Sequence, residues 1–282
     1  MLHELLISTR PKQWYKNLVL FIGIIFSLNF FNLHMWVLSI SAFLTFCMIS
    51  GSEYIINDII DKEKDRIHPR KRNRPIASEK LKVSYALSFA IILLIFAFTI
   101  ASQINIQFLR ISLAYFFLII YYSLYLKHIA IVDVITISIG FVLRAVAGCI
   151  AIKVSISPWL IICAFLVALF LAIGKRRHEL ILLENDANNH RQVFDGFSPE
   201  MLEQMATIVM ASLIMSYSLY TFLADNILMM VTIPIVVYGL FRYLFLVNSR
   251  NMGGEPEVMF KDREIVTCIV LWAVVAIGAL VI

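Results

Sequence analysis

The chain has 282 residues, of which 61% are hydrophobic and only 15% are charged, and its mean hydropathy is +0.85. Soluble globular proteins are about half apolar and about one quarter charged, so this composition excludes a soluble globule and indicates an integral membrane protein. The formal net charge of +5 is modest, but in a membrane protein the distribution of Lys and Arg matters more than their total.

Apolar runs long enough for bilayer-crossing helices recur along the chain, since each crossing needs roughly 20 apolar residues. In chain order they are 17–31, 36–57, 83–101, 106–126, 129–152, 158–174, 203–223, 227–247 and 265–282. Residues 90–98 are apolar at every position, which excludes the alternating polarity of a transmembrane β-barrel strand. We therefore predict an all-α polytopic membrane protein, one domain over 1–282, with nine transmembrane helices around a central cavity.

Lys and Arg concentrate on one side of these predicted spans. With the N-terminus in the cytoplasm, all but three of the 24 basic residues lie in cytoplasmic segments or near the cytoplasmic ends of spans, and the exceptions are Arg110, Arg144 and Lys153. This bias predicts an N-in, C-out topology in the inner cell membrane. The long connections 58–82, 175–202 and 248–264 also fall on the cytoplasmic side, so the cavity is expected to open there.

The most informative polar pattern follows the second predicted span. Tyr54, Asn57, Asp61 and Asp65 recur every three or four residues, so they share one face if the helix continues through them. An amide and carboxylates, without Cys or a His pair, suit Mg²⁺, which joins one or two protein carboxylates to a substrate phosphate. Asp58 points about 100° away and is the weaker ligand candidate. The alternative is a solvated acidic helix end that pairs with neighbouring lysines.

A basic block, Arg70, Lys71, Arg72 and Arg74, follows this acidic stripe directly. Arg and Lys neutralise phosphate charge that a metal leaves uncovered, so the two segments together predict a phosphate-binding site. On its own, the basic block would indicate a cytoplasmic loop that binds anionic lipid head groups.

These segments resemble the UbiA-type prenyltransferase superfamily. Asn57-Asp58-x-x-Asp61-x-x-x-Asp65, in a frame of nine helices, is similar to the first aspartate motif of that superfamily. Further segments resemble its decaprenyl-phosphate phosphoribosyltransferase branch. They are residues 10–17, 68–77, 126–128 with 133–134, 140–145, 174–176 with 179–180, and 253–257.

One departure from the wider superfamily concerns its second aspartate motif, which members that use prenyl diphosphates carry after the sixth helix. Here Lys175 and Arg176 stand in that place. Cations instead of carboxylates favour a donor with an additional phosphate, such as 5-phosphoribosyl diphosphate, opposite a lipid phosphate acceptor. A smaller departure, Glu79 where glycine commonly follows Ala-Ser, is expected to affect only the loop turn.

Arg144 lies in the middle of a predicted span, where an unpaired Arg costs at least ~2.5 kcal/mol. It should therefore face a polar cavity, or form a structural salt bridge, for instance with Glu53. The resemblance implies that Arg144 contacts the lipid phosphate and that Lys16 and Lys127 contact donor phosphates. Without the resemblance, both lysines are equally typical of interface anchors.

The resemblance implies Mg²⁺-dependent transfer of 5-phosphoribose from 5-phosphoribosyl diphosphate to a polyprenyl phosphate, with release of diphosphate. The implied catalytic residues are Asp61, Asp65 and Arg144, the implied metal ligands are Asn57, Asp61 and Asp65, and the implied donor ligands are Lys16, Tyr54, Lys71, Arg72, Lys127, Lys175 and Arg176. Two alternatives stay open: an aromatic or quinone prenyltransferase of the same fold, and a transporter of phosphorylated metabolites. We expect the protein to lie in the lipid bilayer and to bind no nucleic acid. A homo-oligomer is compatible with the sequence.

Overall fold

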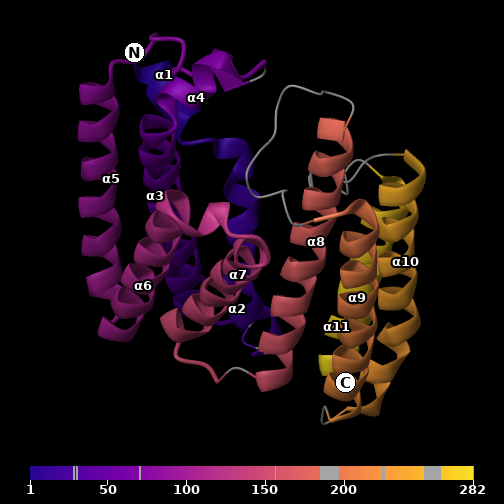
Figure 1. The fold of residues 1–282 in the computed structure, drawn as a ribbon. Coiled ribbons are helices and arrows are strands. Elements are labelled where there is room, and N and C mark those ends of the chain that lie inside the picture. Colours follow the sequence, from indigo (N-terminus) through magenta and orange to yellow (C-terminus); the bar gives the residue numbers. More distant parts are fainter. Residues whose placement is uncertain are drawn as a thin grey trace. The chain divides into compact units, whose positions relative to one another are not determined.

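The computed structural model describes residues 1–27, 29, 31–69, 71–155, 157–184, 197–223, 226–250 and 262–281. In these ranges the chain is built of helices and connecting turns, without a strand (Figure 1). Seven helices of the described part are long and apolar enough to cross a membrane: Leu33–Ile60, Val83–Ile104, Ile106–Leu124, Val132–Ala151, Pro158–Ile181, Pro199–Phe222 and Ile227–Val247. The predicted all-helical, multi-pass membrane protein is confirmed.

The first predicted span has an unexpected construction. Residues Pro11–Phe21 form a 3₁₀ helix, η1, which continues into the five-residue α2, Ile22–Phe26. Most 3₁₀ helices end after three or four residues, so an eleven-residue one is unusual. Arg10, at its N-cap, has a left-handed backbone with φ 51° and ψ 64°. The last predicted span is α11, Arg263–Val281.

Contacts divide the chain into two compact units, one of Met1–Tyr125 with Leu143–Ser155 and one of Leu126–Val142 with Ile156–Ile282. Helix α7, Val132–Ala151, therefore contributes its first half to the second unit and its second half to the first.

In the first unit, α3 (Leu33–Ile60) packs against α5 (Val83–Ile104), α6 (Ile106–Leu124) and η1. Close approach of α5 depends on small residues one or two turns apart, because Ala86, Ala90, Ala97 and Ala101 are its buried positions. Gly148 likewise permits the close approach of α7 to η1, since a Cβ at this position would lie 2.0 Å from the Leu20 carbonyl oxygen.

In the second unit, α8 (Pro158–Glu184), α9 (Pro199–Phe222), α10 (Ile233–Arg250) and α11 surround an apolar core (Figure 1). Asp262 caps α11 by accepting a hydrogen bond of 3.0 Å from the Ile265 N–H. A hydrogen bond from Arg242 holds the pKa of the Asp262 carboxyl below its usual range. In this unit α8, which carries Lys175 and Arg176, lies beside the first turn of α7, because Arg176 forms an ion pair with Asp133.

Candidate active site

The acidic stripe lies where α3 ends and α4, Lys62–Ile67, begins. The helix does not run uninterrupted through the stripe as the prediction required, because Asp61 (φ −89°, ψ 7°) forms a turn between the two helices. The one-turn spacing survives. The backbone N–H of Asp61 donates to the backbone carbonyl of Asn57 at 2.9 Å, and the backbone N–H of Asp65 donates to the backbone carbonyl of Asp61 at 2.8 Å. Asn57, Asp61 and Asp65 therefore stay one helical turn apart across the junction, and their shared function stays a prediction.

Two buried aspartates share two arginines at this junction. Arg74 donates to Asp58 Oδ1 at 3.0 Å and to Asp65 Oδ2, and Arg10 donates to Asp58 Oδ1. The side chains of Asp58 and Asp65 are only 3% and 4% exposed. Buried carboxylates need such partners because an isolated buried charge is very costly. Asp58 and Asp65 thereby fix the loop that carries Arg74 to the end of α3.

Arg10 belongs to the candidate site by its contacts, although the sequence analysis did not name it as a site residue. Its left-handed backbone is uncommon for any non-glycine residue, and Pro11 directly after it restricts the backbone further. In this conformation the guanidinium binds Asp58 and lies 4.8 Å from the centre of the Tyr54 ring. Strained backbone of this kind concentrates at functional sites. The position of Arg10 at the start of the 10–17 segment was the available signal.

Gln13 brings two predicted donor ligands together. The Gln13 Oε1 accepts a hydrogen bond from the Lys16 ammonium and one of 3.4 Å from the Tyr54 hydroxyl. Lys16 and Tyr54 therefore belong to one cluster with Arg10, at the end of α3 where Asn57 lies.

The predicted phosphate-binding cations lie on the loop that the aspartates fix. Lys71 and Arg72 form the short 3₁₀ helix η2, Lys71–Asn73. The Lys71 N–H donates to His68 Nδ1 at 3.3 Å, and the Arg72 N–H donates to the His68 carbonyl at 3.1 Å. Lys71 is half-buried and Arg72 is exposed. Arg70 of the same block, and the predicted segment 253–257, lie outside the described residues.

Arg144 lies in a buried polar network of the first unit. Its Nε donates to Asn17 Oδ1 at 2.9 Å, its Nη2 donates to the Tyr115 hydroxyl, and its guanidinium lies 4.7 Å from the centre of the Tyr115 ring. Glu53 is also buried there, within electrostatic range of Arg144, and its Oε1 has no hydrogen-bond partner. This arrangement has the components of the structural alternative, and the predicted contact with a lipid phosphate stays a prediction.

The remaining predicted ligands, Lys127, Lys175 and Arg176, belong to the second unit. Arg176 is buried and forms a bidentate ion pair with Asp133 of α7, with Nη2 to Oδ1 at 2.9 Å. Arg176 also binds Glu179, whose other oxygen lies 4.0 Å from the Lys175 ammonium. Lys127 is buried in the short helix η3, Leu126–His128. Of the Lys175-Arg176 pair, Lys175 is the more exposed cation.

The fit to Mg²⁺ follows from the donor set. In the described ranges, no three His, Cys, Asp or Glu side chains form a group that could hold a metal by themselves. Mg²⁺ does not require such a group, because it keeps waters and binds one or two carboxylates together with substrate phosphates. The Asn57 amide and the Asp61 carboxylate fit this role, whereas Asp65 is bound by Arg74.

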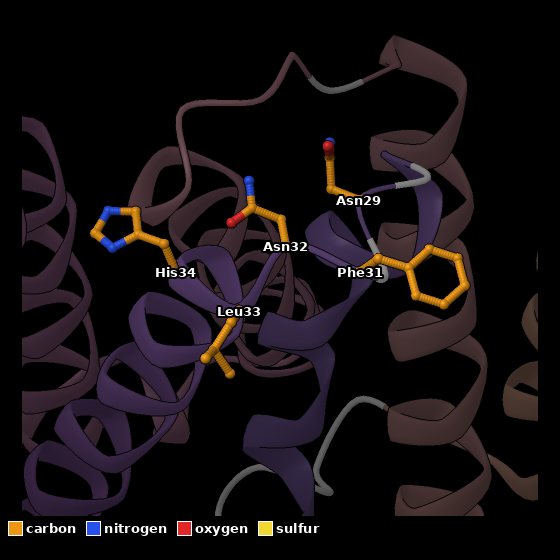
Figure 2. Close-up of a pocket in the computed structure, with 5 residues that line it drawn as sticks. All are labelled: Asn29, Phe31, Asn32, Leu33 and His34. Atoms are coloured by element: carbon orange, nitrogen blue, oxygen red, sulfur yellow. The ribbon is translucent and has the colours of Figure 1, made fainter.

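An open depression of about 620 Å³ lies at the opposite end of α3. Its lining residues point in different directions rather than toward a common centre (Figure 2). They are Asn29, Phe31, Asn32, Leu33 and His34. At 1.5 Å per residue, the 28 residues of α3 separate this depression from Asp61 by about 40 Å. It therefore does not belong to the candidate site.

The fold and the candidate site together define a multi-pass membrane protein with carboxylates and cations gathered at the end of α3. The chain belongs to the UbiA prenyltransferase family, whose sequence profile matches residues 18–262. This confirms the resemblance predicted from the motifs.

Two relatives and one solved structure illustrate the similarity. The decaprenyl-phosphate phosphoribosyltransferase of Corynebacterium glutamicum is 32% identical, over 94% of this chain and 83% of its own. The enzyme of the same name from Mycolicibacterium smegmatis is 28% identical, over 94% and 88%. A UbiA homologue from Archaeoglobus fulgidus bound to GPP and Mg²⁺ has the same fold, with a TM-score of 0.75, 20% identity and coverage of 99% and 100%.

Proposed function

We propose that this protein is a membrane pentosyltransferase that moves 5-phosphoribose from 5-phosphoribosyl diphosphate to a polyprenyl phosphate and releases diphosphate. The observation that carries the proposal is the near full-length similarity to enzymes named decaprenyl-phosphate phosphoribosyltransferase. Lys175, the exposed cation in place of a second aspartate motif, supports it because it favours a donor with an extra phosphate. The product would serve as a precursor for decaprenyl-phosphoryl-arabinose and thus for cell-wall biogenesis.

The proposed chemistry needs charge stabilisation more than proton transfer. As the bond between ribose C1 and the diphosphate oxygen breaks, negative charge accumulates on the diphosphate. Lys16, Lys71 and Arg72 would stabilise this charge, since fixed cations aimed at developing charge lower a barrier effectively. An oxygen of the lipid phosphate forms the new bond to C1. That phosphate is already anionic at neutral pH, so no general base is required.

The proposed ligands extend beyond these three cations. Asn57 and Asp61 would hold Mg²⁺, with Asp65 next to them and fixed by Arg74. When bound, Mg²⁺ supplies charge neutralisation at the diphosphate leaving group. Arg144 would contact the lipid phosphate. The further proposed donor ligands are Tyr54, Lys127, Lys175 and Arg176.

The proposed topology has nine transmembrane helices, with the N-terminus in the cytoplasm and the C-terminus outside. The protein would lie in the inner cell membrane, and its central cavity would open to the cytoplasm. The distribution of Lys and Arg supports this orientation. The two units would function as a single domain over 1–282, because helix α7 is continuous through both.

The decisive experiment uses the purified full-length protein in detergent with ribose-labelled 5-phosphoribosyl diphosphate, a polyprenyl phosphate and Mg²⁺. We expect label to appear in the organic phase only when all three are present. A parallel reaction contains geranyl or farnesyl diphosphate and a phenolic acceptor. Prenylation there, without phosphoribosyl transfer in the first reaction, would establish the aromatic prenyltransferase alternative instead.

A further inference from the structure

The second unit contains an apolar cavity of about 170 Å³ between α8, α10 and α11, which the proposed reaction does not use. Aliphatic and aromatic side chains form most of its wall, including Val167, Phe170, Val236, Leu240, Ile265 and Ile269. The pocket is partly open, and a lining of this kind favours hydrocarbon over water.

Two wall residues with polar hydrogens do not change this character. The Cys268 thiol donates to the Ile235 carbonyl at 3.0 Å, and the Trp272 indole N–H donates to the Tyr217 hydroxyl at 2.7 Å. Both hydrogens are therefore bonded to protein acceptors and are not available to a ligand in the cavity. The wall contributed by Cys268 and Trp272 is apolar.

Hydrogen-bond donors without acceptors lie beside the cavity. Tyr243, which lines it, is 6% exposed, and its hydroxyl has no hydrogen-bond partner. The buried Nε of Arg177 has none either, although the Nη2 of this residue donates to Glu203 at 3.2 Å. Buried donors left without acceptors are costly, so this pair favours a ligand that brings an oxygen.

Tyr243 and Arg177 both line one small space that adjoins the cavity. This space, of about 10 Å³, shares Phe170 and Tyr243 with the cavity. It has room for about one heavy atom. Gly174 keeps it open, because a Cβ there would lie 3.0 Å from the Tyr243 hydroxyl oxygen. A ligand atom in this space would therefore lie beside both Tyr243 and Arg177.

The order of these features along the helices matches that of a membrane lipid. Val167 precedes Arg177 by ten residues on α8, which places the cavity wall about 15 Å deeper along the axis. Val236 precedes Tyr243 by seven residues on α10, or about 10 Å. The donors thus lie toward the helix ends, where lipid head groups lie, and the apolar space lies toward the bilayer centre.

We propose that this cavity binds one anionic phospholipid of the surrounding membrane. One hydrocarbon chain occupies the cavity, and one phosphate or ester oxygen accepts hydrogen bonds from the Tyr243 hydroxyl and the Arg177 Nε. The guanidinium charge favours an anionic lipid over a zwitterionic one, because Glu203 is exposed and occupies a different nitrogen. This proposal does not depend on phosphoribosyl transfer.

Native mass spectrometry of the full chain, reconstituted with phosphatidylglycerol or phosphatidylcholine, tests the proposal. We expect one tightly held phosphatidylglycerol in the unmodified protein. Tyr243→Phe should lower its occupancy about five-fold, the effect of one lost hydrogen bond. Tyr238→Phe is the matched control, because this exposed tyrosine of the same helix donates to Glu264 instead. Val236→Phe should fill the cavity and abolish retention of both lipids.

Equal retention of phosphatidylglycerol by the Tyr243→Phe and Tyr238→Phe proteins would overturn the proposal. One-for-one displacement of phosphatidylglycerol by a polyprenyl phosphate would also overturn it, since the cavity would then belong to the transfer site. Thermal unfolding of each variant is measured alongside. If Val236→Phe fails to fold, the comparison of the two tyrosine variants decides.

Discussion

At the scale of single residues, three aspartates within eight positions have different surroundings. Asp58 and Asp65 are buried against arginines, whereas Asp61 is half-buried at the turn between two helices. Spacing alone made Asp58 the least important of the three. Its contacts instead make it the carboxylate on which Arg10 and Arg74 depend.

We expect Asp61→Asn to abolish turnover while thermal stability stays near that of the unmodified protein, because this residue would act on bound Mg²⁺. Asp58→Asn should instead lower stability by on the order of 3 kcal/mol, since two arginines lose a buried counter-charge. Initial rates and unfolding temperatures, measured on both purified variants, separate the two roles. An active Asp61→Asn protein with unchanged Mg²⁺ dependence would show that the metal assignment is wrong.

Substitution of Glu79, in the loop that follows α4, tests whether backbone strain is stored there. Its φ of 60° is left-handed, and its exposed carboxylate contacts Arg66 and Lys62. Exposed ion pairs add little, while a left-handed non-glycine residue costs about 1 kcal/mol or more. Glu79→Gly should therefore unfold at a higher temperature than Glu79→Ala, with phosphoribosyl transfer unaffected in both. An Ala variant as stable as the Gly variant would show that no strain is stored there.

At the scale of elements, the ion pair between Arg176 and Asp133 joins α8 to the first turn of α7. Lys cannot reproduce the two-pronged contact of a guanidinium, so Arg176→Lys should be destabilising. Asp133→Asn should be destabilising too, and the double variant should lose less stability than the two single losses combined. Additive losses, together with a raised KM for the donor only in the Arg176 variant, would favour a direct donor contact.

The contact of η1 with α7 depends on Gly148. Because a Cβ at this position would lie 2.0 Å from the Leu20 carbonyl oxygen, Gly148→Ala must displace backbone. We expect a loss of about 1–3 kcal/mol in stability and a lower transfer rate, since η1 carries Lys16 and Asn17. Gly278→Ala is the control, because its Cβ would meet no atom within 4 Å. Equal behaviour of the two variants would mean that η1 can shift without consequence.

At the scale of the whole molecule, hydropathy predicted the helices well because a buried or lipid-facing helix requires a continuous apolar run. It failed at η1, where Arg10 and Pro11 set a backbone that run length does not encode. The assignment of Asn57 and Asp61 as metal ligands stays a prediction, and it rests on their lying one turn apart at the end of one helix. The pairing of Arg10 with Asp58 spans 48 residues, and no local pattern specifies such a contact.

Topology is the property of the whole molecule that the charge distribution predicts most directly. All four native cysteines are buried, so a single introduced cysteine can report which side of the membrane it occupies. Lys64 on α4 and Lys153 after α7 are both exposed and suit this purpose. The positive-inside rule places Lys64 in the cytoplasm and Lys153 outside.

We expect a membrane-impermeant maleimide to label Lys153→Cys in intact spheroplasts, and to label Lys64→Cys only in inverted vesicles. The unmodified protein should stay unlabelled in both preparations, because burial protects its thiols. The reverse pattern would place the acidic stripe and the cations of η2 on the outer face. There they could not meet 5-phosphoribosyl diphosphate, a cytoplasmic metabolite too highly charged to cross the bilayer, and the proposed reaction would fail with the topology.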